Sequence, residues 1–367
     1  MPRTIEPAGR AATGAGNGLL KYLGSKRRLV PVLGRIFTAS GARTALDLFT
    51  GTTRVAQEFC RRGGSVTTVD TASYSEILAE CYVVTDAADV DTGEVQAALA
   101  RLAALPPVRG YVTRTFCEDA RYFQPKNGMR IDAIRDGIDR WYGDSPLRPL
   151  LLTSLLEAAD AVDSTVGLQM AYLKQWAPRA ANDLALRVPA LTSGTGTAIR
   201  GDVLDVVPTL PPVDLAYLDP PYNQHRYFTN YHVWETLVRW DAPPSYGVAR
   251  KRADSRDPST RSAFNSRRLM PAALAQTIKA VDAEVVLVSF SDEGFVSLDA
   301  LVEMCRARGE AVEVLAFDSQ RYVGARIGVF NVRGERVGQV GRTRNTEYVV
   351  LAGPAERVRD LVATAQA

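Results

Sequence analysis

Thr44-Ala45-Leu46-Asp47-Leu48-Phe49-Thr50-Gly51-Thr52-Thr53 is the segment that best indicates the architecture of this chain. Residues 44–48 form an apolar run of strand length, and the run breaks at a turn that contains Gly51. A helical pattern follows as far as Gly63-Gly64, and residues 65–69 form a second strand that is closed by Asp70. This order predicts a βαβ unit of the kind that binds nucleotides.

The turn and the acidic residue have complementary chemistry. Backbone N–H groups of the Phe49-Thr50-Gly51 turn can approach a ligand anion at the start of the helix, and Asp70 can accept from the hydroxyls of a ribose. The alternative is a plain turn beside a surface aspartate. The spacing of the two features favours a ligand site.

Alternating strand and helix patterns continue along the chain, which predicts an α/β fold with a mostly parallel sheet. Strand-like runs recur at residues 214–218, 284–290 and 311–317. Residues 326–332 and 346–351 predict an antiparallel hairpin at the C-terminal end of a mixed sheet.

A long helical region separates the first strands from the later ones and divides the chain into expected domains. Helical stretches at residues 131–141, 150–162 and 166–176 predict a mostly helical insertion, in which Lys174, Arg179 and Arg187 form a candidate basic face. We therefore expect a disordered leader (1–17), a catalytic domain (18–75 plus 195–353), a helical insertion that recognises the target (76–194) and a C-terminal tail (354–367).

Bulk composition excludes several classes of protein. The 367 residues are 46% hydrophobic and 23% charged, and no apolar run has the length of a membrane span. The chain has no secretory signal pattern, and its four cysteines form no C-x-x-C pair, so we expect a cytoplasmic protein without a metal site. A net charge of +3 neither indicates nor excludes nucleic acid.

Asp219-Pro220-Pro221-Tyr222, directly after the strand at 214–218, is the strongest chemical signal. An aromatic amine is a poor nucleophile because its lone pair is delocalised, and the Asp219 carboxylate and the Pro220 carbonyl can accept its two hydrogens. The prolines stiffen the loop, and Tyr222 offers a ring on which a base can stack, worth about 1–3 kcal/mol. The alternative is a proline-rich turn with no ligand.

Other segments are weaker candidates. Lys21-Tyr22-Leu23-Gly24-Ser25-Lys26 could meet a ligand carboxylate or could simply begin a helix with a basic face, and Asp202 could accept from an adenosine amine or cap a helix. A basic stretch at residues 246–268 suits contact with DNA phosphates, although a solvated loop has the same composition. Its candidate DNA-binding residues are Arg250, Lys251, Arg252, Arg267 and Arg268.

Three motifs of this chain resemble, in the same order, those of the alpha-class, Dam-like N6-adenine DNA methyltransferases. They are the hexapeptide at residues 21–26, the strand and turn at residues 46–51 and the tetrapeptide at residues 219–222. The resemblance implies a Rossmann-like S-adenosylmethionine-dependent methyltransferase sheet, with the cofactor over the strand ends. It assigns catalysis to Asp219, Pro220 and Tyr222, and cofactor binding to Lys21, Tyr22, Phe49, Gly51, Asp70 and Asp202. The family commonly has a second glycine where this chain has Thr53, so we expect a slightly altered cofactor pocket.

We therefore expect a site-specific methyltransferase that acts on N6 of an adenine flipped out of double-stranded DNA, with S-adenosyl-L-methionine as the methyl donor. A cognate restriction endonuclease is a further possible partner. One alternative is an enzyme that methylates RNA adenine or another amino group. Another is a catalytically silent DNA-binding protein that retains the fold.

Overall fold

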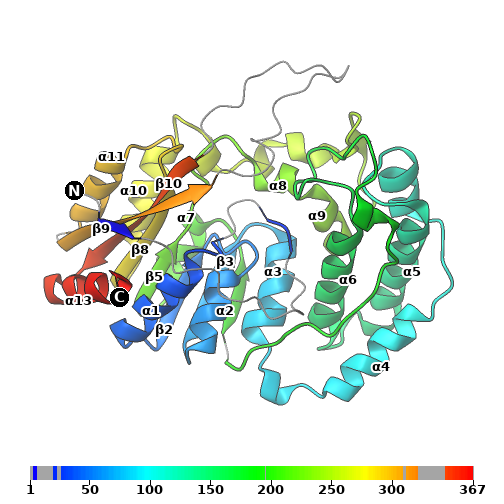
Figure 1. Cartoon of the computed structure of the whole chain (residues 1–367), viewed down its shortest axis with the longest axis horizontal. Helices are drawn as coiled ribbons and strands as arrows, with labels where there is room; N and C mark the ends of the chain where they lie inside the picture. Colours follow the sequence, from blue (N-terminus) through cyan, green and yellow to red (C-terminus); the bar gives the residue numbers. More distant parts are fainter. Residues whose placement is uncertain are drawn as a thin grey trace.

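The computed structural model describes residues 3–5, 20–22, 26–194, 196–308, 311–320 and 344–366. Within these ranges, one sheet contains the strands β1 (Arg3–Ile5), β2 (Thr44–Leu48), β3 (Ser65–Asp70), β4 (Thr197–Arg200), β5 (Val213–Leu218), β8 (Ala283–Ser291), β9 (Ala311–Gln320) and β10 (Arg344–Gly353). Their order across the sheet is β1-β9-β10-β8-β5-β2-β3-β4 (Figure 1).

The sheet is mixed, as predicted. Strands β4, β3, β2, β5 and β8 run parallel, whereas β10 runs antiparallel to both of its neighbours, β8 and β9. The predicted hairpin strand at residues 326–332 lies outside the described residues, and within them the antiparallel partners of β10 are β8 and β9. The first part of the expected leader is ordered, because β1 pairs with β9.

Helices cover both faces of the sheet. One face packs against α1 (Val30–Ser40), α2 (Arg54–Arg61) and α13 (Ala355–Gln366), and the other against α7 (Val203–Val206), α10 (Met270–Ala280) and α11 (Leu298–Arg306). Alternate residues of β5 belong to the two cores, which explains its continuous apolar sequence. The stretch that we expected to be a tail is α13, and its Val358 and Leu361 are buried.

A helical half lies beside the sheet (Figure 1). It contains α3 (Ser73–Ala79), α4 (Thr92–Ala103), α5 (Pro125–Tyr142) and α6 (Arg148–Val162), together with α8 (Tyr227–Asn230) and α9 (His232–Arg239). Tyr231 and Trp234 are buried in the same core as α5 and α6, although we had assigned residues 195–353 to the catalytic domain. The chain therefore returns to the helical half directly after Asp219-Pro220-Pro221-Tyr222.

The helix expected at residues 166–176 is absent. Side chains hold this stretch in turns, because the Thr165 hydroxyl donates to Asp163 and accepts from the Gly167 N–H, and Gly167 has φ +92°. Within the described ranges, no helix is both long and apolar enough to cross a membrane.

Candidate active site

The C-terminal ends of β2, β3, β4 and β5 meet at one edge of the sheet, because these strands are parallel neighbours. A pocket lies at this edge, and it brings together the residues that follow all four strands. Its lining includes Phe49, Asp70, Thr71, Gly201, Asp202, Val203, Asp219 and Pro221. A smaller pocket adjoins it and shares Tyr22, Phe49 and Asp219 with it.

Asp70 shapes the turn between β2 and α2. One carboxylate oxygen accepts from the Gly51 N–H at 2.9 Å, and the other accepts from the Ala72 N–H at 3.0 Å. Burial raises the pKa of Asp70 above its ordinary value, and these backbone hydrogen bonds oppose the rise. The carboxylate therefore holds the turn in place while it lines the pocket.

Thr53, the departure from the family pattern, adopts the backbone conformation that a glycine would favour. Its φ is +60°, and its buried hydroxyl donates to the Thr52 carbonyl and accepts from Gln57. Thr53 lines neither pocket, whereas the adjacent Thr52 lines the smaller one. The substitution therefore affects the backbone of the turn and not the surface that meets a ligand.

Asp219 stands where β5 ends, and its N–H donates to the Leu48 carbonyl at 3.3 Å. Burial raises the pKa of Asp219 to about 6, while the Lys26 ammonium, 3.1 Å from the carboxylate, opposes that rise. Pro220 is buried, and the Tyr222 ring packs edge-on against Phe290 with ring centres 5.8 Å apart. The motif thus places the Asp219 carboxylate and Pro221 on the pocket lining, whereas Pro220 and Tyr222 line neither pocket.

Lys21, the lysine that the resemblance assigned to the cofactor, lies elsewhere. Its ammonium group is 3.1 Å from Asp163 and also donates to the Asp160 carbonyl, and Lys21 lines neither pocket. Lys26 lines the smaller pocket instead. The structure thus pairs the Lys21 ammonium group with Asp160 and Asp163 and not with either pocket, and its role in cofactor binding stays a prediction.

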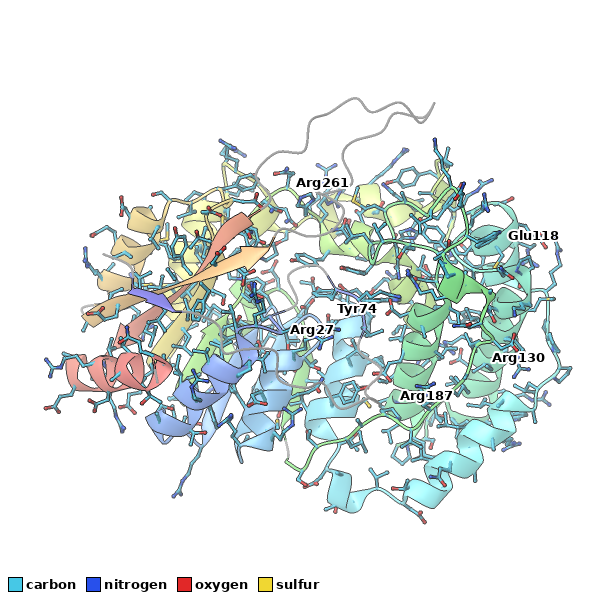
Figure 2. All side chains as sticks on the ribbon, viewed as in Figure 1. Arg27, Tyr74, Glu118, Arg130, Arg187 and Arg261 are labelled. Carbon is cyan, nitrogen blue, oxygen red and sulfur yellow. The ribbon has the colours of Figure 1, made fainter. Side chains whose placement is uncertain are left out.

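Tyr22 connects the two pockets to the helical half. Its ring stacks on Tyr231 and Tyr227, with centres 4.6 and 5.3 Å apart, and its hydroxyl is 3.4 Å from that of Tyr74. Figure 2 shows Tyr74 between the sheet and the helical half. Burial raises the pKa of Tyr22 well above its ordinary value, so this phenol stays neutral.

Sequence reasoning missed the residues that cover the main pocket. Arg226 donates to Thr260, and Asn265 donates to the carbonyls of Asn223 and His225, so two distant segments are tied together. The additional lining residues are Arg226, Tyr227, Phe228, Thr260, Ser262, Phe264 and Asn265. The signals in the sequence were the aromatic residues after Tyr222 and the basic stretch at residues 246–268, which we interpreted as a contact with DNA.

Asp202 caps a helix and also lies on the pocket lining. One carboxylate oxygen accepts from the Leu204 N–H at 3.0 Å, which caps α7, and the residue also lines the main pocket. A single side chain can do both because a carboxylate has two oxygens and about four acceptor sites.

The five candidate DNA-binding residues have different surroundings. Arg252, in the short strand β7 (Lys251–Arg252), is 1% exposed and forms a bidentate pair with Asp241 and a second pair with Asp254. Its assignment to DNA is therefore wrong. Arg250 pairs with Asp119 at 3.3 Å and Lys251 is half-buried, whereas Arg267 and Arg268 are exposed.

The proposed basic face of the insertion is likewise divided. Arg179 pairs with Asp163 at 2.6 Å, whereas Lys174 and Arg187 are exposed. Of the three, Arg179 is held by an ion pair with a buried acid, and the expected basic face stays a prediction.

The main pocket fits S-adenosylmethionine. Phe49 and Phe264 offer ring surfaces, with centres 4.8 Å apart, and Asp70 and Asp202 place carboxylates on the lining. An adenosine needs apolar surface for its ring and acceptors for its hydroxyls and amine. A sheet with one reversed strand and such a pocket over its strand ends defines an S-adenosylmethionine-dependent methyltransferase.

The chain belongs to the D12 class N6 adenine-specific DNA methyltransferase family, whose model matches residues 22–304. It is an adenine-specific DNA methyltransferase, and S-adenosyl-L-methionine is the methyl donor of this family. Among the enzyme alternatives, DNA rather than RNA is therefore the substrate.

Three known proteins show the range of similarity. The chain is 28% identical to the type II methyltransferase M.NlaIII of Neisseria lactamica, over 79% of this chain and 89% of that protein. It is 26% identical to the modification methylase StsI of Streptococcus sanguinis, over 78% of this chain but only 46% of that protein. A putative RNA methyltransferase from Pyrococcus horikoshii aligns with 10% identity and a TM-score of 0.32, over 92% of this chain and 89% of that one.

Proposed function

We propose that this protein methylates N6 of an adenine that is rotated out of duplex DNA at one defined sequence. The observation that carries the proposal is the position of Asp219, which directly follows β5 and lines the main pocket together with Pro221 and Tyr227. An adenine stacked inside a duplex cannot enter a pocket at the edge of a sheet, so the base must leave the stack, at a cost of a few kcal/mol.

The chain supplies acceptors and a fixed geometry. The Asp219 carboxylate and the Pro220 carbonyl accept from the two N6 hydrogens, and Tyr222 stacks on the base. The bound cofactor supplies an electrophilic methyl group. Because the amine nitrogen gains positive charge as its bond to the methyl carbon forms, the negative charge of Asp219 stabilises the transition state.

DNA contact is proposed at the mouth of the pocket. The segment that includes the pocket residues Thr260, Ser262, Phe264 and Asn265 also carries exposed arginines. These are Arg256, Arg261, Arg267 and Arg268. Phosphates bound by these guanidinium groups would place the duplex over the pocket.

Replacement of Asp219 tests the proposal. Asp219→Ala should abolish transfer of radiolabelled methyl groups to duplex DNA, with little change in the affinity for S-adenosylhomocysteine measured by calorimetry. Asp205→Ala, which alters an exposed acid beyond the pocket lining, is the matched control and should keep wild-type activity. Methylation by the Asp219→Ala protein would contradict the assignment of this residue.

A cognate restriction endonuclease is a further proposal, supported by the names of the relatives, which are a type II methyltransferase and a modification methylase. N6-methyladenine should be mapped in DNA from cells that contain the wild-type protein or the Asp219→Ala protein. A single methylated sequence that also blocks cleavage by a nuclease from the same cell would support it. Scattered methylation would contradict both site specificity and this pairing.

A further inference from the structure

Lys26 is a buried lysine whose ammonium group points at the catalytic motif. Its side chain is 5% exposed, and its Nζ lies 3.1 Å from Oδ1 of Asp219. Its backbone carbonyl accepts from the N–H groups of Leu29 and Val30 at 2.7 and 2.8 Å, which fixes the residue at the start of α1. The lysine is therefore held from two sides.

The linings of the two pockets show on which side of Asp219 the Lys26 side chain lies. Asp219 lines both pockets, whereas Lys26 lines only the smaller one. The ammonium group thus meets the carboxylate at the smaller pocket, whose lining includes none of residues 260–265. The rest of the carboxylate remains available to a ligand in the main pocket.

We propose that Lys26 is a positioning residue of the methyl-transfer reaction: it keeps the Asp219 carboxylate ionised and turned toward the target amine. This inference rests on the proposed role of Asp219. A carboxylate accepts hydrogen bonds with both oxygens, but a protonated acid loses one acceptor. Without a nearby cation, an acid buried at this site would tend to take up a proton.

The ion pair between Lys26 and Asp219 matters because positive charge develops on the amine nitrogen during methyl transfer. The amine nitrogen forms a bond to the methyl carbon, and the methyl–sulfur bond breaks with its electron pair remaining on sulfur. The nitrogen then carries a positive charge until one N–H proton is released to water. An ionised Asp219 stabilises that charge throughout, and Lys26 keeps Asp219 from binding a proton before the reaction begins.

The surroundings of Asp219 both raise and lower its pKa. Burial raises the pKa of Asp219, Lys26 lowers it, and Glu347 of β10 raises it further. Burial opposes the charge of Lys26, but Asp219 and Glu347 outweigh it, so the pKa of Lys26 is raised well above its ordinary value. The remaining ionisable groups of the two pocket linings are Tyr22, Asp47, Arg54, Asp70, Asp202, Tyr217, Arg226 and Tyr227, and Tyr222 and Glu293 lie nearby.

Two substitutions that should move the acidic midpoint of the reaction in opposite directions, Lys26→Gln and Glu347→Gln, test the inference. Single-turnover methylation of duplex DNA should be measured from pH 5 to pH 10 for the wild-type, Lys26→Gln, Lys26→Arg and Glu347→Gln proteins. In Lys26→Gln the acidic midpoint should rise by about one to three pH units, because the opposing charge is lost. Lys26→Arg should stay near the wild-type midpoint, and Glu347→Gln should move it downward.

Calorimetry gives the same information without turnover. An ionised Asp219 favours cationic S-adenosylmethionine over neutral S-adenosylhomocysteine, so the ratio of the two affinities should change with pH, and Lys26→Gln should shift that change upward. A uniform loss of affinity for both ligands would show instead that Lys26 binds the cofactor directly, and would overturn the inference.

Failure of this inference is distinguishable from failure of the proposed function. An active wild-type protein whose acidic midpoint is the same in Lys26→Gln and Glu347→Gln would overturn the role of Lys26 alone. If Lys26→Gln does not fold, the direction of the shift in Glu347→Gln decides. A wild-type protein that methylates no duplex DNA would contradict the proposed function, and the affinity ratio would then test the pair independently.

Discussion

The ring of Tyr22 occupies the space in which a side chain on residue 51 would lie. A Cβ added to Gly51 would be 2.9 Å from Cε1 of Tyr22, and the φ of Gly51 is +54°. The turn after β2 therefore requires glycine for two independent reasons: the left-handed backbone and the close approach of the ring.

Gly51→Ala should lower both stability and cofactor affinity. The left-handed backbone costs about 1–2 kcal/mol for a residue with a Cβ, and displacement of Tyr22 deforms both pockets. We expect the affinity for S-adenosylhomocysteine to fall about tenfold or more, measured by calorimetry. The control is Gly63→Ala, where φ is +85° but nothing lies within 4 Å. Equal losses of affinity in the two variants would contradict a specific role for the Tyr22 contact.

Replacement by methionine should lower the stability of the protein at Arg252 but not at Arg268. Arg252→Met leaves Asp241 and Asp254 without their buried partner and should lower the free energy of unfolding by about 3 kcal/mol. Arg268→Met changes an exposed side chain, so stability should change by less than about 0.5 kcal/mol.

The same pair of variants tests the DNA surface. The affinity of Arg268→Met for duplex DNA should fall, and the slope of log affinity against log salt should decrease by about 1. Urea unfolding and fluorescence anisotropy measure the two properties. If Arg268→Met binds DNA with the wild-type salt dependence, this residue does not contact phosphate.

Asp47 should make stability depend on pH near neutrality. Burial raises its pKa to about 7, although hydrogen bonds from Thr50 and Ala56 oppose the rise. Between its ordinary pKa, about 4, and pH 7 the folded protein binds a proton that the unfolded chain does not bind. The contribution of Asp47 to stability is therefore largest below pH 4 and is lost as the pH rises toward 7.

Asp47→Asn removes this titration. Relative to the wild-type protein, the variant should gain about 2 kcal/mol of unfolding free energy between pH 5 and pH 8, measured by urea unfolding at both values. Asp214→Asn is the control, because hydrogen bonds from Thr44 and Arg43 lower the pKa of Asp214, which is ionised throughout this range. A similar pH-dependent gain in the control would show that Asp47 is not the source.

Several features could be predicted from the sequence because they depend on local order. The βαβ unit and the strand before Asp219 follow from apolar periodicity, and parallel strands place the residues after them at the same edge. Phe49, Asp70, Asp202 and Asp219 were identified in this way, and all four line the main pocket. The antiparallel end of the sheet was also predicted, although its pairing was not.

The residues that cover the pocket could not be predicted. Thr260 and Phe264 are far along the chain from Phe49, and no local pattern distinguishes them from an ordinary loop. Their position depends on hydrogen bonds such as those from Arg226 to Thr260, which form only when distant segments meet. The assignment of α9 to the helical half has the same cause, because its partners lie in α5 and α6.

The class of sheet, the order of the motifs and the position of Asp219 after a strand could all be determined from the sequence, since each depends on residues close together in the chain. Only the tertiary structure decided which of two lysines in one hexapeptide meets Asp219, and which arginines of one basic segment remain at the surface. The reason is physical: burial and charge pairing depend on what the rest of the molecule brings to a side chain. Lys26 and Arg252 therefore acquired their partners only through the fold.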